Sequence, residues 1–238
     1  MKKEEVCNLI KTIGIIPAIR VSSSDDAHFA AEAVTHGGIP MVEITMTVPG
    51  AVELIAHLVR YHPTMVVGAG TVCDLETARK CIAAGATFLT APGFDLEIVE
   101  FAAKQDIAVL PGALTPTEVL TAWRAGSDFV KVFPCSLVGG DKYIKALKAS
   151  FPQIPLIAAG GVNQQTAANF ILSGASAIGV GKELIPTESI ECKQSERIQE
   201  LAMRFSRLVK EAREQIEEWK RTFVPQKFGG SENCDEKA

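Results

Sequence analysis

The chain has 238 residues and a formal net charge of −4, and 47% of its residues are hydrophobic. An acidic chain of this composition offers no basic face for nucleic acid, and its longest apolar runs are too short to span a bilayer. Acidic residues among the N-terminal lysines argue against a signal peptide. We therefore expect a cytoplasmic protein with no nucleic-acid partner and no membrane contact.

Short apolar runs alternate along the chain with amphipathic stretches. We predict eight strands, at residues 13–21, 41–47, 65–72, 87–92, 107–113, 128–134, 155–161 and 177–183. Helical patterns lie between them, among them residues 25–38, 74–86, 95–106, 115–127 and 163–175. Several of these patterns begin with Asp, Thr or Asn and end with Gly, as helix caps require.

Strands that alternate with helices are joined by crossovers and therefore run parallel. Near-continuous apolar strands indicate a sheet that is buried on both sides. Eight such units predict an α/β fold, a closed (β/α)8 barrel of the TIM type. A doubly wound open sheet is the alternative, but the turn PAIRVSSSDD after the first strand lacks the glycine-rich nucleotide-binding pattern typical of such sheets.

A long helical pattern rich in Glu, Lys and Arg follows the last predicted strand. We expect residues 1–192 to form the barrel, 193–223 a helical extension that packs on the barrel or on a neighbouring subunit, and the polar residues 224–238 a disordered tail. Apolar residues recur along the extension at spacings of three and four: Ile198, Leu201, Phe205, Leu208, Val209, Ile216 and Trp219.

The cysteines and histidines show no chemical motif. No two cysteines form a C-x-x-C pair, and a chain of this size does not depend on disulfides, so we predict free thiols in a reducing compartment. Cys135 follows the sixth strand and could line a pocket, but nothing beside it indicates a nucleophile. The spacing of His28, His36, His57 and His62 does not suggest a metal site, and we expect no metal.

A lysine stands at the centre of the sixth apolar run. Side chains of a barrel strand alternate between the lumen and the helix layer, so Phe129, Lys131 and Phe133 share one face. An outward Lys131 would meet the helix layer without an obvious partner, whereas an inward one reaches the C-terminal mouth, where barrels carry their active sites. We therefore place Lys131 in the lumen.

The same alternation brings further polar residues to the lumen. It groups Glu43 with Met41 and Thr45 on the second strand, Arg20 with Ala18 on the first, and Thr71 with Ala69 on the third. A buried salt bridge of Glu43 with Lys131 or Arg20 is the structural alternative, but desolvation makes such pairs poor stabilisers. A charged cluster in a barrel mouth is better explained by function.

These side chains suit carbon–carbon bond cleavage beside an α-keto acid. A lysine in an apolar pocket favours its free amine, which can attack a ketone to form an imine that stabilises a neighbouring carbanion. A nearby carboxylate can move protons, and an arginine can hold a substrate carboxylate.

Two glycine-rich turns, AAGGVNQQT and GVGKEL, follow the seventh and eighth strands. Barrels commonly bind phosphate there through backbone N–H groups, although glycine also serves tight turns. Lys182 could add a cation to a bound phosphate, or it could be a solvated helix residue.

Six segments occur in an order and spacing that resemble the 2-keto-3-deoxy-6-phosphogluconate (KDPG) aldolase family, which includes 4-hydroxy-2-oxoglutarate (KHG) aldolases. They are VEITMTVPGA, VGAGTV, TAPG, LPGALTPTE, FVKVFPCSLVGG and AAGGV, and the resemblance covers about residues 8–190. It implies a metal-independent class I aldolase on a (β/α)8 barrel, without a cofactor, that acts on keto acids and aldehydes and usually assembles as a homotrimer.

The resemblance also implies roles for individual residues. Lys131 would form the Schiff base and Glu43 would be the general acid/base. Arg20 would bind the substrate carboxylate, and other positions would shape the pocket or cradle the phosphate. The pocket residues would be Thr71, Pro92, Gly93, Phe133 and Ala159, and the phosphate residues Gly160, Gly161, Gly181 and Lys182.

Two positions depart from the family pattern. Ala159 replaces a threonine that would meet the sugar hydroxyls, and Lys182 replaces a phosphate-side serine. A site that lacks a polar group discriminates weakly against substrates, so the departures concern the substrate and not the reaction type.

We expect reversible cleavage of a phosphorylated 2-keto-3-deoxy sugar acid to pyruvate and D-glyceraldehyde 3-phosphate. The alternatives are a KHG aldolase that releases glyoxylate, a phosphate-binding isomerase or epimerase with Glu43 as base, and a non-catalytic barrel that acts through its C-terminal helix.

Overall fold

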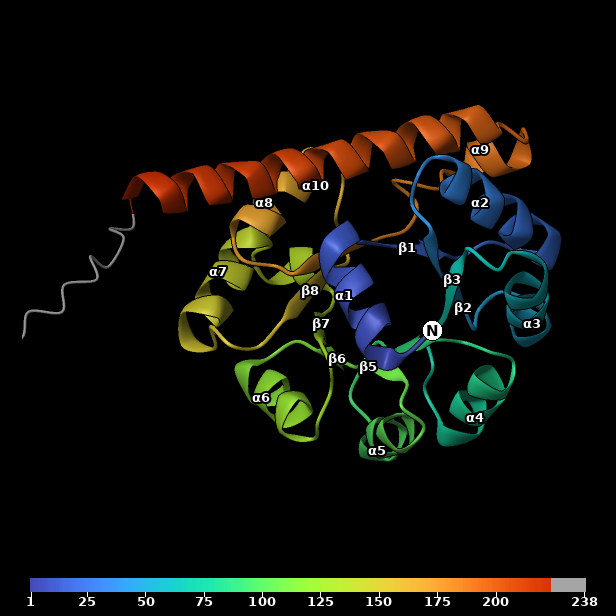
Figure 1. Cartoon of the computed structure of the whole chain (residues 1–238), viewed down its shortest axis with the longest axis horizontal. Helices are drawn as coiled ribbons and strands as arrows, with labels where there is room; N and C mark the ends of the chain where they lie inside the picture. The colour runs from blue at the N-terminus through green and yellow to red at the C-terminus, as the bar shows by residue number, and fades with distance from the viewer. Residues whose placement is uncertain (224–238) are drawn as a thin grey trace, which may run out of the picture.

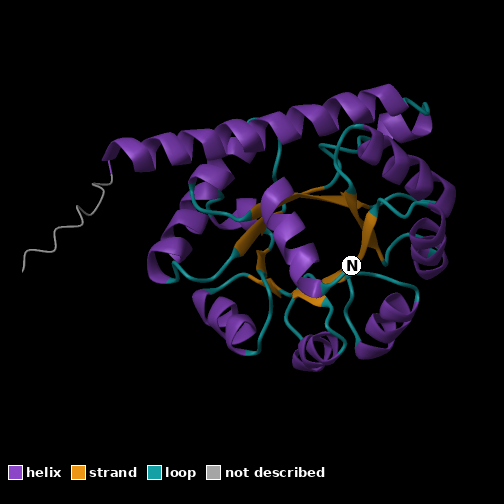
Figure 2. Ribbon diagram, in the orientation of Figure 1, coloured by secondary structure: helices purple, strands orange, loops and turns teal. Residues whose placement is uncertain are grey.

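The apolar runs form one parallel sheet that curves into a barrel (Figures 1 and 2). The computed structural model describes residues 1–223, so the tail predicted at 224–238 lies outside the described residues. The strands follow the order β5-β4-β3-β2-β1-β9-β8-β7-β6. Their bounds are β1 (Ile15–Ile19), β2 (Met41–Thr45), β3 (Val66–Gly70), β4 (Phe88–Thr90), β5 (Ala108–Leu110), β6 (Gly112–Ala113), β7 (Val130–Val132), β8 (Leu156–Ala159) and β9 (Ala177–Val180).

All eight predicted strands are present, and the fifth is divided at Pro111 into β5 and β6. A proline has no N–H to donate to a neighbouring strand. Before Pro111 the segment pairs with β4, and after it the segment pairs with β7. This change of partner connects the two edges of the sheet, so the predicted (β/α)8 barrel is confirmed.

The helices surround the barrel in the order that the sequence predicts. Side-chain caps fix several of their starts: Ser23, Asp74 and Asp95 each accept a hydrogen bond from a backbone N–H in the first helical turn. The helices are α1 (Lys3–Ile13), α2 (Ser24–His36), α3 (Ala51–Tyr61), α4 (Leu75–Ala83), α5 (Leu96–Lys104), α6 (Pro116–Arg124), α7 (Asp141–Ser150), α8 (Ala167–Leu172), α9 (Thr187–Glu191) and α10 (Ser195–Phe223), with a short 3-10 helix η1 (Cys135–Val138).

The barrel lumen has its own apolar core, separate from the layer between strands and helices. Its members come from the inward positions of the strands, such as Met41, Phe88 and Phe129, together with Val6 and Ile10 of α1. Helix α1 crosses the barrel opening (Figure 1) and ends just before β1 begins. It therefore closes the N-terminal end of the lumen and leaves the C-terminal end for the site.

The predicted C-terminal extension is the single helix α10, which lies along α2 and α8 (Figure 1). Gly37, after α2, allows the close approach, because a Cβ there would lie 2.6 Å from the Cβ of Ala202. Of the predicted apolar stripe, Ile198, Leu201, Phe205 and Val209 are buried, Leu208 and Ile216 are partly buried, and Trp219 is 58% exposed.

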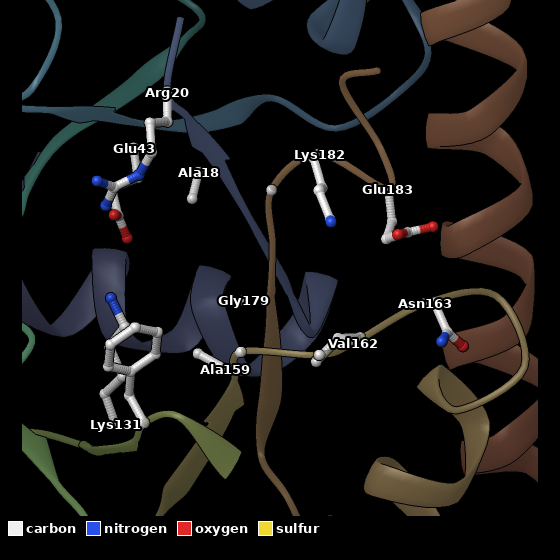
Figure 3. A pocket seen from close by; sticks show the side chains of 14 residues that line it. Ala18, Arg20, Glu43, Lys131, Ala159, Val162, Asn163, Gly179, Lys182 and Glu183 are labelled. Carbon is white, nitrogen blue, oxygen red and sulfur yellow. The ribbon is translucent and has the colours of Figure 1, made fainter. Parts of the chain in front are cut away.

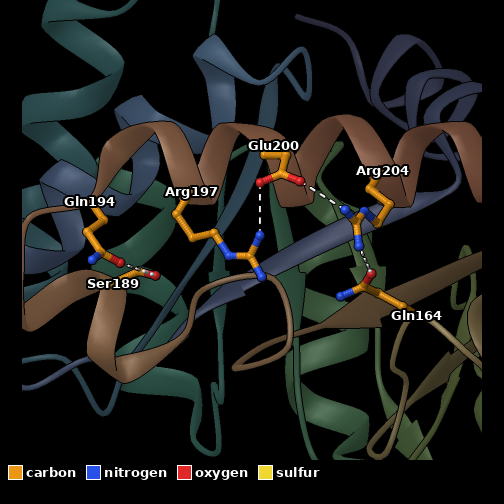
Figure 4. Close-up of polar contacts among 6 residues, drawn as sticks. All are labelled: Gln164, Ser189, Gln194, Arg197, Glu200 and Arg204. Atoms are coloured by element: carbon orange, nitrogen blue, oxygen red, sulfur yellow. Dashed lines mark hydrogen bonds and ion pairs between the residues drawn. The ribbon is translucent and has the colours of Figure 1, made fainter.

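Polar contacts attach α10 to the loop after β8 (Figure 4). Glu200 accepts hydrogen bonds from Arg197 at 2.8 Å and from Arg204 at 2.9 Å. Arg204 also donates to the side-chain oxygen of Gln164 at 2.8 Å. None of the helices in the described part of the chain combines the length and the apolar content that a membrane span requires.

Candidate active site

Strand β7 carries Lys131 into the lumen, as the alternation predicts. The residue pairs in register with Gly112 of β6 and Ile157 of β8. Phe129 lies in the lumen core, whereas Val130 and Val132 belong to the helix-facing core. The Lys131 ammonium nitrogen lies 3.4 Å from the Thr90 hydroxyl and 5.6 Å from the centre of the Phe133 ring.

Glu43 faces the same lumen from the opposite wall. It lies on β2 between Ala18 of β1 and Gly68 of β3, and it is only 3% exposed. Its carboxylate occupies the space above Gly70, because a Cβ at position 70 would overlap it. Gly70, the second glycine of the VGAG segment, thus makes room for the acid.

These residues line a pocket of about 340 Å³ at the C-terminal mouth of the barrel (Figure 3). In Figure 3 the Lys131 amine and the Glu43 carboxylate point toward one another, with Arg20 beside Glu43. The other end of the pocket holds Lys182 and the backbone after β8. The lining consists of Ala18, Arg20, Glu43, Lys131, Phe133, Ala159, Gly160, Gly161, Val162, Asn163, Gly179, Gly181, Lys182 and Glu183.

No salt bridge holds the charged groups of this pocket together. Within residues 1–223, no ion pair of 4.0 Å or less joins Glu43 to Lys131 or to Arg20. Lys131 is half-buried and Arg20 is exposed, so the lumen is open to solvent at its mouth. The groups are available to a ligand instead of neutralising one another.

Thr71 contacts Arg20 of the site, but the alternation of strand side chains does not explain its position. The predicted lumen pairing with Ala69 is wrong: Ala69 packs in the helix-facing core, and Val66 belongs to the lumen core. Thr71 follows β3 with a φ of 60°, a conformation that is strained for a β-branched residue. Its hydroxyl accepts a hydrogen bond of 3.0 Å from the Arg20 guanidinium, so the strained turn orients the arginine.

Thr71 itself does not line the pocket, but most of the remaining predicted site residues do. Phe133, Ala159, Gly160, Gly161, Gly181 and Lys182 all do so. Pro92 and Gly93 do not line it: the Gly93 carbonyl accepts a hydrogen bond from the Gly112 N–H, and Gly93 borders a separate, much smaller cavity.

Three polar residues of the site were missed from the sequence. Thr90 is 2% exposed and contacts Lys131, and alternation from Phe88 along the fourth strand would have found it. Asn163 and Glu183 line the far end of the pocket from the loops after β8 and β9. Loop side chains follow no period, so only their nearness to the glycine turns could have indicated them.

Cys135 does not act in this site. It begins η1 directly after the Lys131 strand but is fully buried and does not line the pocket. Burial raises the pKa of its thiol to about 11, and the nearby Asp141 carboxylate adds to this effect. A thiol with a raised pKa is a poor nucleophile at neutral pH. All five cysteines of the described chain are free.

Three of the histidines lie close together, although their spacing in the sequence does not indicate it. His28, His57 and His62 meet on the surface with ligand nitrogens within 4.8 Å of one another. The contact between α2 and α3 brings them together, and linear spacing does not report such a contact.

Known proteins resemble this chain in sequence and in fold. Residues 6–201 match the family model described as KDPG and KHG aldolase. The KHG/KDPG aldolase of Escherichia coli K12 is 29% identical over 82% of this chain and 92% of that protein. A KDPG aldolase of Legionella pneumophila, solved with pyruvate captured as a covalent carbinolamine, is 30% identical, with a TM-score of 0.77 over 83% of this chain and 96% of that one. A designed protein cage made by fusing symmetric oligomeric domains is 31% identical, with a TM-score of 0.80 over 88% of this chain and 77% of that one.

Proposed function

The chain belongs to the KDPG and KHG aldolase family, and on this basis we propose that it is a class I aldolase that uses Lys131 to form an imine. It would reversibly cleave a 2-keto-3-deoxy-6-phospho sugar acid to pyruvate and D-glyceraldehyde 3-phosphate. The observation that carries the proposal is the pair of Lys131 and Glu43, which face one another across the pocket without forming an ion pair (Figure 3).

Lys131 would supply the nucleophile. Its neutral amine attacks the C2 ketone to give a carbinolamine, whose hydroxyl takes up a proton and leaves as water, so that a protonated imine remains. Thr90 and the Phe133 ring hold the amine at the lumen face of β7. The positive imine then accepts the electron pair released when the C3–C4 bond breaks.

Glu43 would carry the protons. The carboxylate removes the proton of the C4 hydroxyl as the aldehyde leaves, and the enamine then takes a proton at C3. Hydrolysis of the imine releases pyruvate and returns the free amine. Arg20, oriented by Thr71, would hold the C1 carboxylate, and this pairing keeps C2 within reach of Lys131.

The far end of the pocket would receive the phosphate. Gly160, Gly161 and Gly181 present backbone there, and Lys182 adds a positive charge. Figure 3 shows Lys182 pointing toward the pocket and Glu183 pointing to the side.

Two observations favour KHG aldolase activity as a second candidate function. Ala159 offers no hydroxyl to a sugar, and the Glu183 carboxylate opposes the charge of Lys182 at the end where a phosphate would bind. The E. coli relative carries both names, KHG and KDPG aldolase. If phosphate is recognised, Lys182→Ala lowers kcat/KM for KDPG and leaves that for KHG nearly unchanged.

Reduction with borohydride in the presence of pyruvate tests the mechanism. We expect peptide mass spectrometry to find one reduced pyruvate adduct, on Lys131, and none in Lys131→Arg. Lys182→Ala is the matched control, because Lys182 is the other lysine that lines the pocket; it should retain the adduct. An adduct at another residue would overturn the role of Lys131, and no adduct at all would point instead to an isomerase or epimerase with Glu43 as base.

We further propose that the enzyme works without a metal cofactor, resides in the cytoplasm and assembles as a homotrimer. The family resemblance supports the absence of a metal cofactor and the homotrimer, and the free cysteines of residues 1–223 agree with a reducing compartment such as the cytoplasm. The similarity to a cage built from symmetric oligomeric domains supports an oligomer in general.

A further inference from the structure

Three histidines converge on the outer surface between α2 and α3. His28 comes from the second turn of α2, His57 from α3, and His62 directly follows α3. One ligand nitrogen of each lies within 4.8 Å of the others. None of the three lines the substrate pocket, so this cluster, here called the His cluster, is separate from the aldolase site.

The distance between two of these nitrogens matches the separation of two ligands of one metal ion. The Nε2 atoms of His28 and His62 are 3.3 Å apart. Two nitrogens that each lie about 2.0–2.1 Å from a tetrahedral Zn²⁺ are separated by about 3.3–3.4 Å. The two nitrogens therefore need almost no movement to share one ion.

A carboxylate completes the set. Glu32 lies one turn after His28 on α2, and its Oε1 atom is 3.9 Å from Nε2 of both His28 and His62. This oxygen can approach an ion held between the two imidazoles, so three nitrogens and one oxygen are available for four-coordination.

Ordinary packing explains only part of the cluster. A single hydrogen bond accounts for His28 and His62 if one ring donates and the other accepts. This bond does not involve His57, whose ring packs on that of Tyr61 at a centroid distance of 4.6 Å and meets that of His28 edge-on at 5.2 Å. The side chains of His28 and His62 are 34% and 26% exposed, so an ion from solvent can reach them.

We propose that His28, His57, His62 and Glu32 bind a late first-row divalent cation, with Zn²⁺ as the best match. Imidazole is a favoured ligand of Zn²⁺, Cu²⁺ and Ni²⁺, and an oxygen-only cation such as Mg²⁺ or Ca²⁺ does not suit this set. The ion would join α2 to α3 and thereby stabilise the folded chain. It would take no part in the aldol reaction.

Isothermal titration of the untagged full-length protein with Zn²⁺ tests the site. We expect about one ion per chain and a rise in the unfolding temperature when Zn²⁺ is added. His62→Ala should weaken binding by at least the roughly 10–100-fold that loss of even an outer-shell partner costs. His36→Ala is the matched control, because His36 is an exposed histidine of the same helix α2 outside the cluster, and it should bind as the wild type does.

The absorption spectrum of bound Co²⁺ distinguishes nitrogen and oxygen ligands from thiolates. We expect Co²⁺ to give the visible absorption of a tetrahedral nitrogen and oxygen site, without the intense sulfur charge-transfer band that thiolates from the exposed Cys73 or Cys192 would add. Glu32→Gln preserves the shape of the side chain and should weaken binding while the protein remains folded.

Unchanged Zn²⁺ affinity in His62→Ala, no binding by the wild type, or a thiolate spectrum would each overturn the proposal. Aldolase activity is a separate readout: a chelator should remove the ion and its stabilising effect without altering borohydride trapping at Lys131. A failed metal site therefore leaves the proposed reaction untouched, and the reverse also holds.

Discussion

Glu43 shows at the scale of a single residue how a buried acid is kept available. It is 3% exposed, and within the described residues it has no ion-pair partner. The space that its carboxylate occupies exists because position 70 is glycine. An unpaired buried carboxylate destabilises a fold, so its retention beside Lys131 is consistent with a proton-transfer role.

Replacement of this acid by its amide tests that role. Glu43→Gln should still form the borohydride adduct at Lys131, because imine formation needs the amine. It should exchange the methyl protons of pyruvate about 10²–10⁴-fold more slowly, the usual contribution of general acid–base catalysis. NMR in deuterated buffer measures the exchange.

Glu183→Gln is the matched control, because Glu183 also lines the pocket but lies at the opposite end (Figure 3). Its exchange rate should stay close to that of the wild type. An unchanged rate in Glu43→Gln would remove Glu43 from the mechanism.

At the scale of elements, α10 does more than cover the barrel. It packs on α2 and α8, and its Arg204 contacts the loop that also carries Asn163 of the pocket. Further along the helix, Arg213 donates hydrogen bonds to the carbonyl oxygens of Lys11, Thr12 and Ser176. These carbonyls belong to the end of α1 and to the residue before β9, so one side chain ties the extension to the closed end of the barrel.

Loss of the Arg213 hydrogen bonds should lower the stability of the fold. We expect Arg213→Ala to reduce the free energy of unfolding by about 1–3 kcal/mol, because carbonyl groups at the end of α1 lose a charged donor. Urea denaturation followed by circular dichroism measures the change. Arg207→Ala is the control: this side chain is 67% exposed and, among residues 1–223, forms only a surface pair with Glu211, so the change should stay within about 0.5 kcal/mol. Equal effects of the two variants would contradict the assignment.

At the scale of the whole molecule, the mass of the assembly tests the proposed homotrimer. Closed cyclic symmetry is the usual solution for identical chains. A homotrimer should give a mass three times the 25.5 kDa of one chain in light scattering coupled to size exclusion, unchanged over a wide range of loading concentrations. A single-chain or two-chain mass would contradict it.

The sequence by itself determined the barrel and the placement of Lys131 and Glu43 in its lumen. Eight apolar runs, the helix caps and the two-residue alternation of strands are local properties, and parallel crossovers leave few ways to combine them. Lys131 and Glu43 could therefore be placed in one lumen before any contact was known. The apolar stripe of α10 was predictable for the same reason, since its period of three and four residues is also local.

Only the tertiary structure decided the contacts of residues whose positions do not follow the period of a strand or helix. Thr71 meets Arg20 because the chain leaves β3 with a positive φ, and this turn interrupts the alternation on which the prediction depended. Asn163 and Glu183 reach the pocket from loops. The His cluster arises where α2 packs on α3, and the separations of its members in the sequence carry no trace of that packing. Periodicity reports which face of an element a residue occupies, but distances between residues of different elements depend on how those elements pack.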